Sequence, residues 1–132
     1  MSSAFGEWML IATLLACGLI HLLPVAGVLG GQWLDKLYGV TVKAPDLLIL
    51  MRHRAILFGL IGAALIAAAM VPGLRIIAAI FGLISMLAFV WLAFGVETSA
   101  QIRRVVWIDV VLSVLLGVAL VLRLLFSRDG AA

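Results

Sequence analysis

Four apolar runs dominate the chain and are separated by short polar stretches. A bilayer core of about 30 Å is crossed by about 20 helical residues, so each run is long enough to span a membrane. Long helices joined by short connections are typical of a four-helix bundle. We therefore predict an all-α membrane fold, a four-transmembrane-helix bundle that forms a single membrane domain over residues 1–132. The predicted spans cover about residues 8–29, 50–71, 76–96 and 105–126.

Turn and cap residues mark the ends of these spans. Pro24 and Gly27 predict that the first helix is kinked or loosened near its end. The connector over about residues 30–49 contains a short amphipathic piece at 33–38, which is suited to lie in the membrane interface. Asp46 follows Pro45 at a capping position and opens the second helix.

Small residues recur at a spacing of four in all four predicted helices, and the second helix has the most. In lipid, such residues let helix backbones approach closely, so that van der Waals contacts hold the helices together. We expect the second helix to be the most buried one. The remaining small-residue surface favours packing with a second copy, as a homo-oligomer, or with a larger membrane partner. The small residues of the second helix are Gly59, Gly62, Ala63, Ala64, Ala67, Ala68 and Ala69.

Composition excludes a soluble domain. The chain is 67% hydrophobic and 11% charged, with a mean hydropathy of +1.36. A typical soluble domain has about 25% charged residues, so the apolar surface of this chain has to be solvated by the lipid bilayer. The net charge is +3. We expect no nucleic-acid binding, because the chain has no basic stripe interleaved with aromatic residues.

The basic residues predict the orientation of the bundle. Six of them fall in or beside the connectors at about 30–49 and 97–104, and three fall on the other side. Lys and Arg are enriched in cytoplasmic loops, so we expect both connectors to be cytoplasmic and both termini to be non-cytoplasmic. The first group is Lys36, Lys43, Arg52, Arg54, Arg103 and Arg104, and the second is Arg75, Arg123 and Arg128.

Polar residues converge on the predicted cytoplasmic half. Asp109 lies about five residues inside the fourth helix, roughly 8 Å deep at 1.5 Å per residue. An ionisable residue that faces lipid costs about 2.5–3.5 kcal/mol, so Asp109 should face the interior. We expect it to pair with an arginine of the 52–54 run and to have His21 nearby. The candidate polar cluster is His21, Arg52, His53, Arg54, Glu97, Arg104 and Asp109.

Two interpretations of this cluster stay open. In the simpler one, it is a buried clamp that fixes helix register, while Arg52 and Arg54 anchor the second helix at the headgroups by snorkelling. In the other, the cluster lines a cytoplasm-facing pocket for an anionic or polar ligand, or a proton path. The clamp predicts that Asp109→Asn weakens folding or assembly. The pocket predicts that the same change leaves folding intact and removes the response to ligand or pH.

Cofactor and enzyme chemistry have little support in the sequence. Bis-histidine haem ligation would need His21 and His53 at similar depth, and His53 is too near the headgroups. No pair of His, Asp or Glu has metal-ligand spacing on one helix, so no metal site is predicted. No phosphate loop, nucleophile elbow or His-Glu metal helix is present. A membrane enzyme that uses Asp109 and His21 as acid and base remains as a third alternative.

Three stretches of the chain carry a resemblance. HLLPVAGVLGGQWLDKLYGV, LMRHRAILFGLIGAAL and GLISMLAFV together resemble a family of small uncharacterised four-helix bacterial inner-membrane proteins. The resemblance implies a multi-pass protein of the cell inner membrane, and no functional residues follow from it. Some members of that family carry a phosphopantetheine adenylyltransferase label. This chain does not fit the label, because it has no soluble α/β domain and no His-x-Gly-His motif.

The sequence therefore predicts a small polytopic inner-membrane protein without evident catalysis. Its expected role is that of a structural or accessory component that packs with itself or with a larger partner. The alternative is a small transporter or ligand-binding membrane protein that uses the cytoplasm-side polar cluster.

Overall fold

The fold is described by a computed structural model over residues 3–128, and every regular element in that range is a helix. Four of the helical stretches are long and apolar enough to cross a membrane: Ala4–Leu29, Pro45–Met70, Pro72–Ala93 and Ala100–Phe126. This confirms the predicted all-α fold with four long apolar helices. In chain order the elements are α1 (Ser3–Leu22), the 3-10 helix η1 (Leu23–Leu29), α2 (Gly31–Tyr38), α3 (Pro45–Met70), the 3-10 helix η2 (Pro72–Leu74), α4 (Arg75–Ala93) and α5 (Ala100–Arg128).

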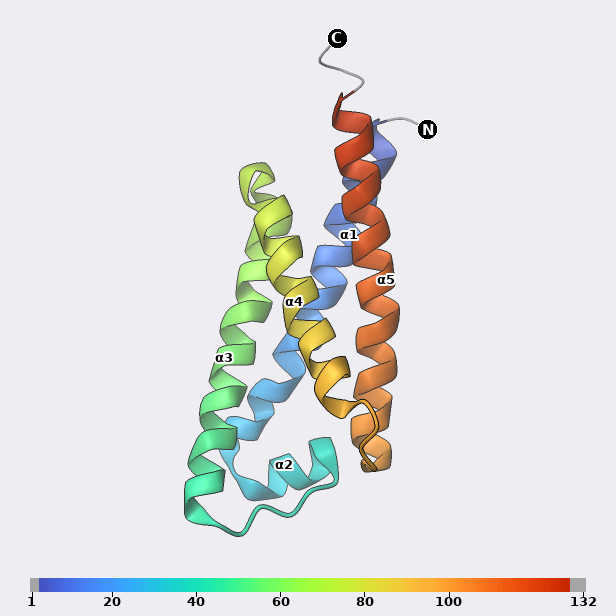
Figure 1. Ribbon diagram of the computed structural model, residues 1–132. Coiled ribbons are helices and arrows are strands. Elements are labelled where there is room, and N and C mark those ends of the chain that lie inside the picture. The colour runs from blue at the N-terminus through green and yellow to red at the C-terminus, as the bar shows by residue number, and fades with distance from the viewer. Residues whose placement is uncertain (1–2, 129–132) are drawn as a thin grey trace.

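The long helices run side by side and alternate in direction (Figure 1). The start of α1, the turn between α3 and α4, and the end of α5 lie at one end, which we call the terminal end. The short helix α2, the start of α3 and the connector between α4 and α5 lie at the opposite end, which we call the α2 end. The two connectors with the most basic residues therefore lie together.

The first span, not the second, is the most buried, so the expectation for the second helix was wrong. Of an apolar stretch of 18 residues taken from each span, 33% are buried in the first and 28% in the second. α1 packs against both α3 and α5, and therefore presents buried residues to two neighbours. The small residues of α3 serve this contact only in part. Gly62 faces α1, whereas Ala63, Ala64 and Ala67 are exposed.

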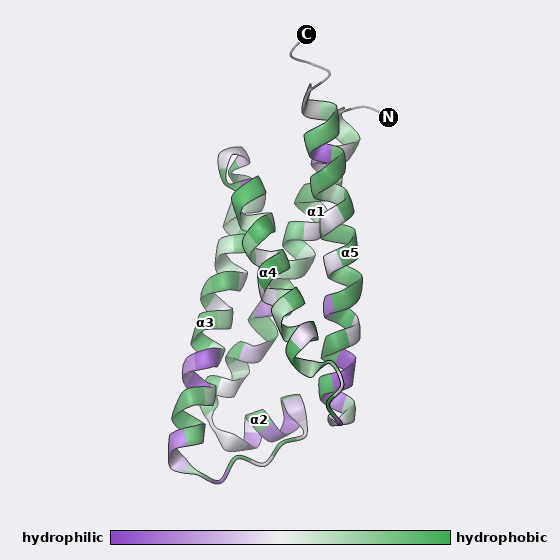
Figure 2. Cartoon of the chain, viewed as in Figure 1, coloured by the Kyte–Doolittle hydropathy of each residue, from purple (hydrophilic) through white to green (hydrophobic). Residues whose placement is uncertain are grey.

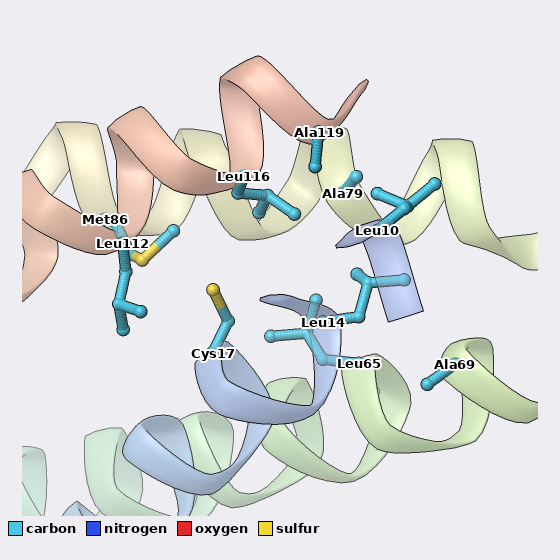
Figure 3. Packing of buried hydrophobic residues seen from close by; sticks show 10 residues of the cluster. All are labelled: Leu10, Leu14, Cys17, Leu65, Ala69, Ala79, Met86, Leu112, Leu116 and Ala119. Atoms are coloured by element: carbon cyan, nitrogen blue, oxygen red, sulfur yellow. The ribbon is translucent and has the colours of Figure 1, made fainter. Parts of the chain in front are cut away.

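The core runs along the middle of the bundle and draws on all four long helices (Figure 3). Leu10, Leu14 and Cys17 are fully buried on α1. Cys17 is a free thiol and acts as a small packing residue. The other helices contribute Leu65, Ala69, Ala79, Met86, Leu112, Leu116 and Ala119.

The end of the first span and the connector after it position α2. Helix α1 changes to the 3-10 helix η1 at Leu23, beside Pro24, which has no N–H and cannot continue an α-helix undisturbed. This is the form that the predicted kink takes. The predicted amphipathic piece is the helix α2, with Leu34 and Tyr38 buried. Gly39, in the left-handed region at φ 63°, ends α2.

Candidate functional site

Hydrophilic residues gather on α2 and on the first turns of α3 and α5, with few along the middle of the bundle (Figure 2). A cavity of about 240 Å³ lies among them, bounded by α1, η1, α2, α3, α4 and α5. We call it the α2 cavity. Its buried lining residues are His21, Tyr38 and Asp109, and the more exposed ones at its rim include Lys36, Gln101 and Arg104.

Arg54 forms part of the cavity wall and is held by aromatic rings. Its guanidinium carbon lies 4.8 Å from the ring centre of Phe58, 5.3 Å from that of Tyr38 and 5.7 Å from that of Phe89. A cation over the face of an aromatic ring is attracted by the ring's quadrupole, by about 0.5–2 kcal/mol per contact. Three rings from α2, α3 and α4 therefore fix the position of this charge.

Asp109 is the acidic residue in the lining of the α2 cavity. Its residue is 7% exposed, and it lines the α2 cavity. Of the 52–54 run, only Arg54 lines the same cavity as Asp109. Within residues 3–128, however, Asp109 forms no ion pair and no hydrogen bond through its side chain. The Asp109 carboxylate oxygens are not among the fully buried side-chain atoms without a partner in the described chain, and the residue lines the cavity, so the carboxylate can accept a donor that enters it.

His21 is committed to contacts inside the protein. It is 3% exposed, and its Nδ1 lies 2.8 Å from the Cys17 carbonyl oxygen. A carbonyl oxygen only accepts, so Nδ1 carries the proton and donates it. The Nε2 atom lies 3.1 Å from the Ser85 hydroxyl, which donates to it when the imidazole is neutral. Use of His21 as a base or as a ligand would require one of these bonds to break.

Three residues of the predicted cluster lie outside the cavity lining. Arg52 is exposed and donates its Nε–H to the Val28 carbonyl oxygen at 2.7 Å, which ties α3 to the end of η1. His53 is exposed on α3, and Glu97 is exposed in the connector before α5. The α2 cavity brings together the remaining four, His21, Arg54, Arg104 and Asp109.

Sequence reasoning missed the contribution of α2 to this site. Lys36 and Tyr38 reach the cavity because α2 folds back across the end of the bundle. The Ser99 hydroxyl donates to the Tyr38 carbonyl oxygen at 2.5 Å, which attaches α2 to the start of α5. Burial raises the pKa of Tyr38, and the neighbouring Arg54 charge opposes that shift. The amphipathic pattern of 33–38 was the available signal, but it does not show which way the helix folds.

A second charged group lies at the terminal end and was also missed. The Glu7 carboxylate accepts a hydrogen bond from Arg75 and forms ion pairs with both Arg75 and Arg123, which joins α1 to α4 and α5. Arg75 also donates to the Ala69 carbonyl oxygen, at 3.1 Å from Nε and 2.8 Å from Nη2, and so closes the last turn of α3. These contacts form a polar clamp between helices at the end of the bundle opposite Asp109.

No protein-family model, no curated protein and no solved structure matches the chain. The interpretation of the α2 cavity therefore rests on its own residues.

Proposed function

We propose that this chain is a multi-pass protein of the cell inner membrane that binds an anionic ligand, one bearing a phosphate or carboxylate group, in the α2 cavity. The connectors around the cavity carry the most basic residues, which supports a cytoplasmic α2 end and non-cytoplasmic termini. Holding an anion involves no chemical step, so we propose a binding or transport role without catalysis.

The observation that carries this proposal is the state of Arg54. Its charge is half-buried and fixed by three rings, yet no carboxylate forms an ion pair with it in the described part of the chain. A guanidinium presents five N–H donors in a planar fork that matches phosphate and carboxylate groups. A fixed arginine fork that faces a cavity is thus prepared to take an anion.

The surrounding charges support the same ligand class. Lys36 and Arg104 line the cavity with Arg54, so three cations oppose the single carboxylate of Asp109. Lys36 and Arg104 are exposed, whereas Arg54 lies deeper. The exposed pair would draw an anion toward the cavity, and Arg54 would hold it.

Paired arginine substitutions on α3 test the proposal. Arg54→Gln removes the charge in the cavity, and Arg52→Gln removes an equal charge two residues away that does not line it. The purified protein is titrated in neutral detergent with phosphatidylglycerol and, separately, with inorganic phosphate, and bound ligand is counted by native mass spectrometry. A charge-assisted hydrogen bond contributes about 1.5–3 kcal/mol, so Arg54→Gln should weaken binding about ten-fold or more. Arg52→Gln should bind like the wild type. Equal binding by all three proteins would overturn the proposal.

Self-association is a second candidate, favoured by a separate apolar groove. The groove has a volume of about 440 Å³, lies between α3 and α4, and is lined only by apolar residues, among them Leu60, Ala64 and Phe81. Exposed Ala63 and Ala67 on α3 would let a neighbouring helix approach closely. If a second copy packs here, Ala64→Phe should reduce the dimer fraction in native mass spectra. Leu115→Phe, an exposed position on α5, should not.

A further inference from the structure

The carboxylate of Asp109 disfavours a ligand that carries only negative charge. It lines the same cavity as Arg54 and is 93% covered by the protein, without a hydrogen bond or ion pair among residues 3–128. A phosphate bound at Arg54 would bring a second negative charge near this carboxylate. Like charges repel, and the repulsion grows as water is excluded from between them. The ligand that suits both groups therefore carries a cation of its own.

We infer that the α2 cavity binds a zwitterion, whose phosphate or carboxylate group pairs with Arg54 and whose protonated amine donates to Asp109. This inference rests on the proposed anion site and adds the second half of the ligand. Arg54 is on α3 and Asp109 is on α5, so the ligand bridges two helices that face the same cavity.

The aromatic contacts explain why Arg54 does not satisfy Asp109 itself. The guanidinium rests over Tyr38, Phe58 and Phe89. Moving it onto the carboxylate would give up some of these cation–π contacts. Arg54 and Asp109 line the same cavity, and no ion pair forms between them in the described chain. An ammonium group placed at Asp109 would complete the charge balance.

The apolar lining of the cavity suits the carbon atoms that link the two charged groups of the ligand and any acyl chain attached to them. Ile20, Phe58 and Ile108 line the cavity together with the polar groups, and Leu23 lines it while being 59% exposed. The chemistry shared by the candidate ligands is an ammonium group a few bonds from an anionic group. Its source is either the headgroup of an aminophospholipid or a free zwitterion such as phosphoethanolamine.

Three probes separate the two halves of the ligand and its two sources. Phosphatidylethanolamine has both charges, phosphatidylglycerol has the phosphate without the amine, and phosphoethanolamine has the headgroup without the acyl chains. Binding of each is measured by native mass spectrometry on the wild type, Asp109→Asn and Arg54→Gln.

The wild type should bind phosphatidylethanolamine about ten-fold more tightly than phosphatidylglycerol, as expected for one charge-assisted hydrogen bond. Asp109→Asn should lose that preference while still binding phosphatidylglycerol, and Arg54→Gln should lose both lipids. Binding of phosphoethanolamine at matching affinity would identify a free zwitterion as the ligand, and its failure to bind would identify the lipid.

The two proposals fail in different ways. If the wild type binds both lipids equally and Arg54→Gln binds neither, the anion site stands and the zwitterion inference falls. If none of the three probes binds, both fall. If Asp109→Asn does not fold, the zwitterion inference is tested on the wild type alone, by comparing its binding of phosphatidylcholine and phosphatidylethanolamine. The quaternary ammonium of phosphatidylcholine has no N–H to donate, so this lipid should bind more weakly than phosphatidylethanolamine, and equal affinity would overturn the inference.

Discussion

Gly18 of α1 and Gly62 of α3 bring their two backbones into direct contact. A Cβ atom on Gly18 would lie 2.9 Å from the Gly62 carbonyl oxygen, and one on Gly62 would lie 2.8 Å from the Gly18 carbonyl oxygen. No side chain fits at either position without a shift of the helices. This contact fixes the distance between α1 and α3, the helices that carry His21 and Arg54 to the lining of the α2 cavity.

Gly62→Ala should therefore destabilise the protein. The added methyl group meets backbone, which cannot rotate away, and overpacking of this kind costs about 1–3 kcal/mol. Gly117→Ala on α5 is the matched control, because a Cβ there meets nothing within 4 Å and alanine favours a helix. Thermal unfolding in detergent checks the pair. A melting temperature for Gly62→Ala at or above that of Gly117→Ala would contradict the close contact.

The terminal clamp supplies a second prediction. Glu7→Gln removes the negative charge that Arg75 and Arg123 share. Since hydrogen bonds to charged groups contribute about 1.5–3 kcal/mol, the variant should unfold more readily. Its binding at the α2 cavity should be unchanged, because Glu7 belongs to the first turns of α1, and α1 begins at the opposite end of the bundle.

A double-mutant cycle on Glu7→Gln and Arg123→Gln measures the coupling within the clamp. The combined change should cost less than the sum of the two single changes, because each single change already breaks the shared pair. Strict additivity of the unfolding free energies would show that the pair is not formed.

Ser99 is expected to hold α2 in place. Its hydroxyl donates to the Tyr38 carbonyl oxygen and accepts from the Ile102 N–H at 3.2 Å, so it caps α5 and attaches α2 at once. Loss of a cap of this type costs about 0.5–2 kcal/mol. Ser99→Ala should increase amide hydrogen exchange over residues 31–39 and at the first turn of α5. Protection equal to that of the wild type in both segments would show that α2 is held by other contacts.

The proposed orientation can be tested with single cysteines. Cys17 is buried and should not react, so Gly73→Cys and Glu97→Cys each present one accessible thiol. A membrane-impermeant maleimide added to intact cells lacking an outer membrane barrier should label Gly73→Cys and leave Glu97→Cys unlabelled until the membrane is permeabilised. The reverse pattern would invert the orientation and place the α2 cavity outside the cytoplasm.

The four long helices could be predicted because apolar runs of membrane-spanning length leave little choice of structure. Contacts between distant polar residues could not. Glu7 and Arg75 are 68 positions apart, and each alone resembles a residue flanking a span. They meet because an antiparallel bundle returns α4 to the end where α1 begins.

Only part of the α2 cavity could be predicted from the sequence. Asp109 stands out because an acidic residue inside an apolar run needs a partner, and Arg54 is near it in depth. Phe58 follows Arg54 by four positions on α3, which is a local pairing, but Tyr38 and Phe89 come from α2 and α4 and have no local signature. Lys36 and Tyr38 enter the site only through the path of the chain after Pro24, and hydropathy does not show that path.

If Arg54 holds an anionic ligand in the α2 cavity, that ligand should co-purify with the protein. Wild type, Arg54→Gln and Arg52→Gln are purified from the same membranes in a mild neutral detergent, and their intact masses are compared by native mass spectrometry. We expect a phosphate- or carboxylate-bearing adduct on the wild type and on Arg52→Gln, and its loss from Arg54→Gln. The same adduct retained on Arg54→Gln, or no adduct on any of the three proteins, would contradict this expectation.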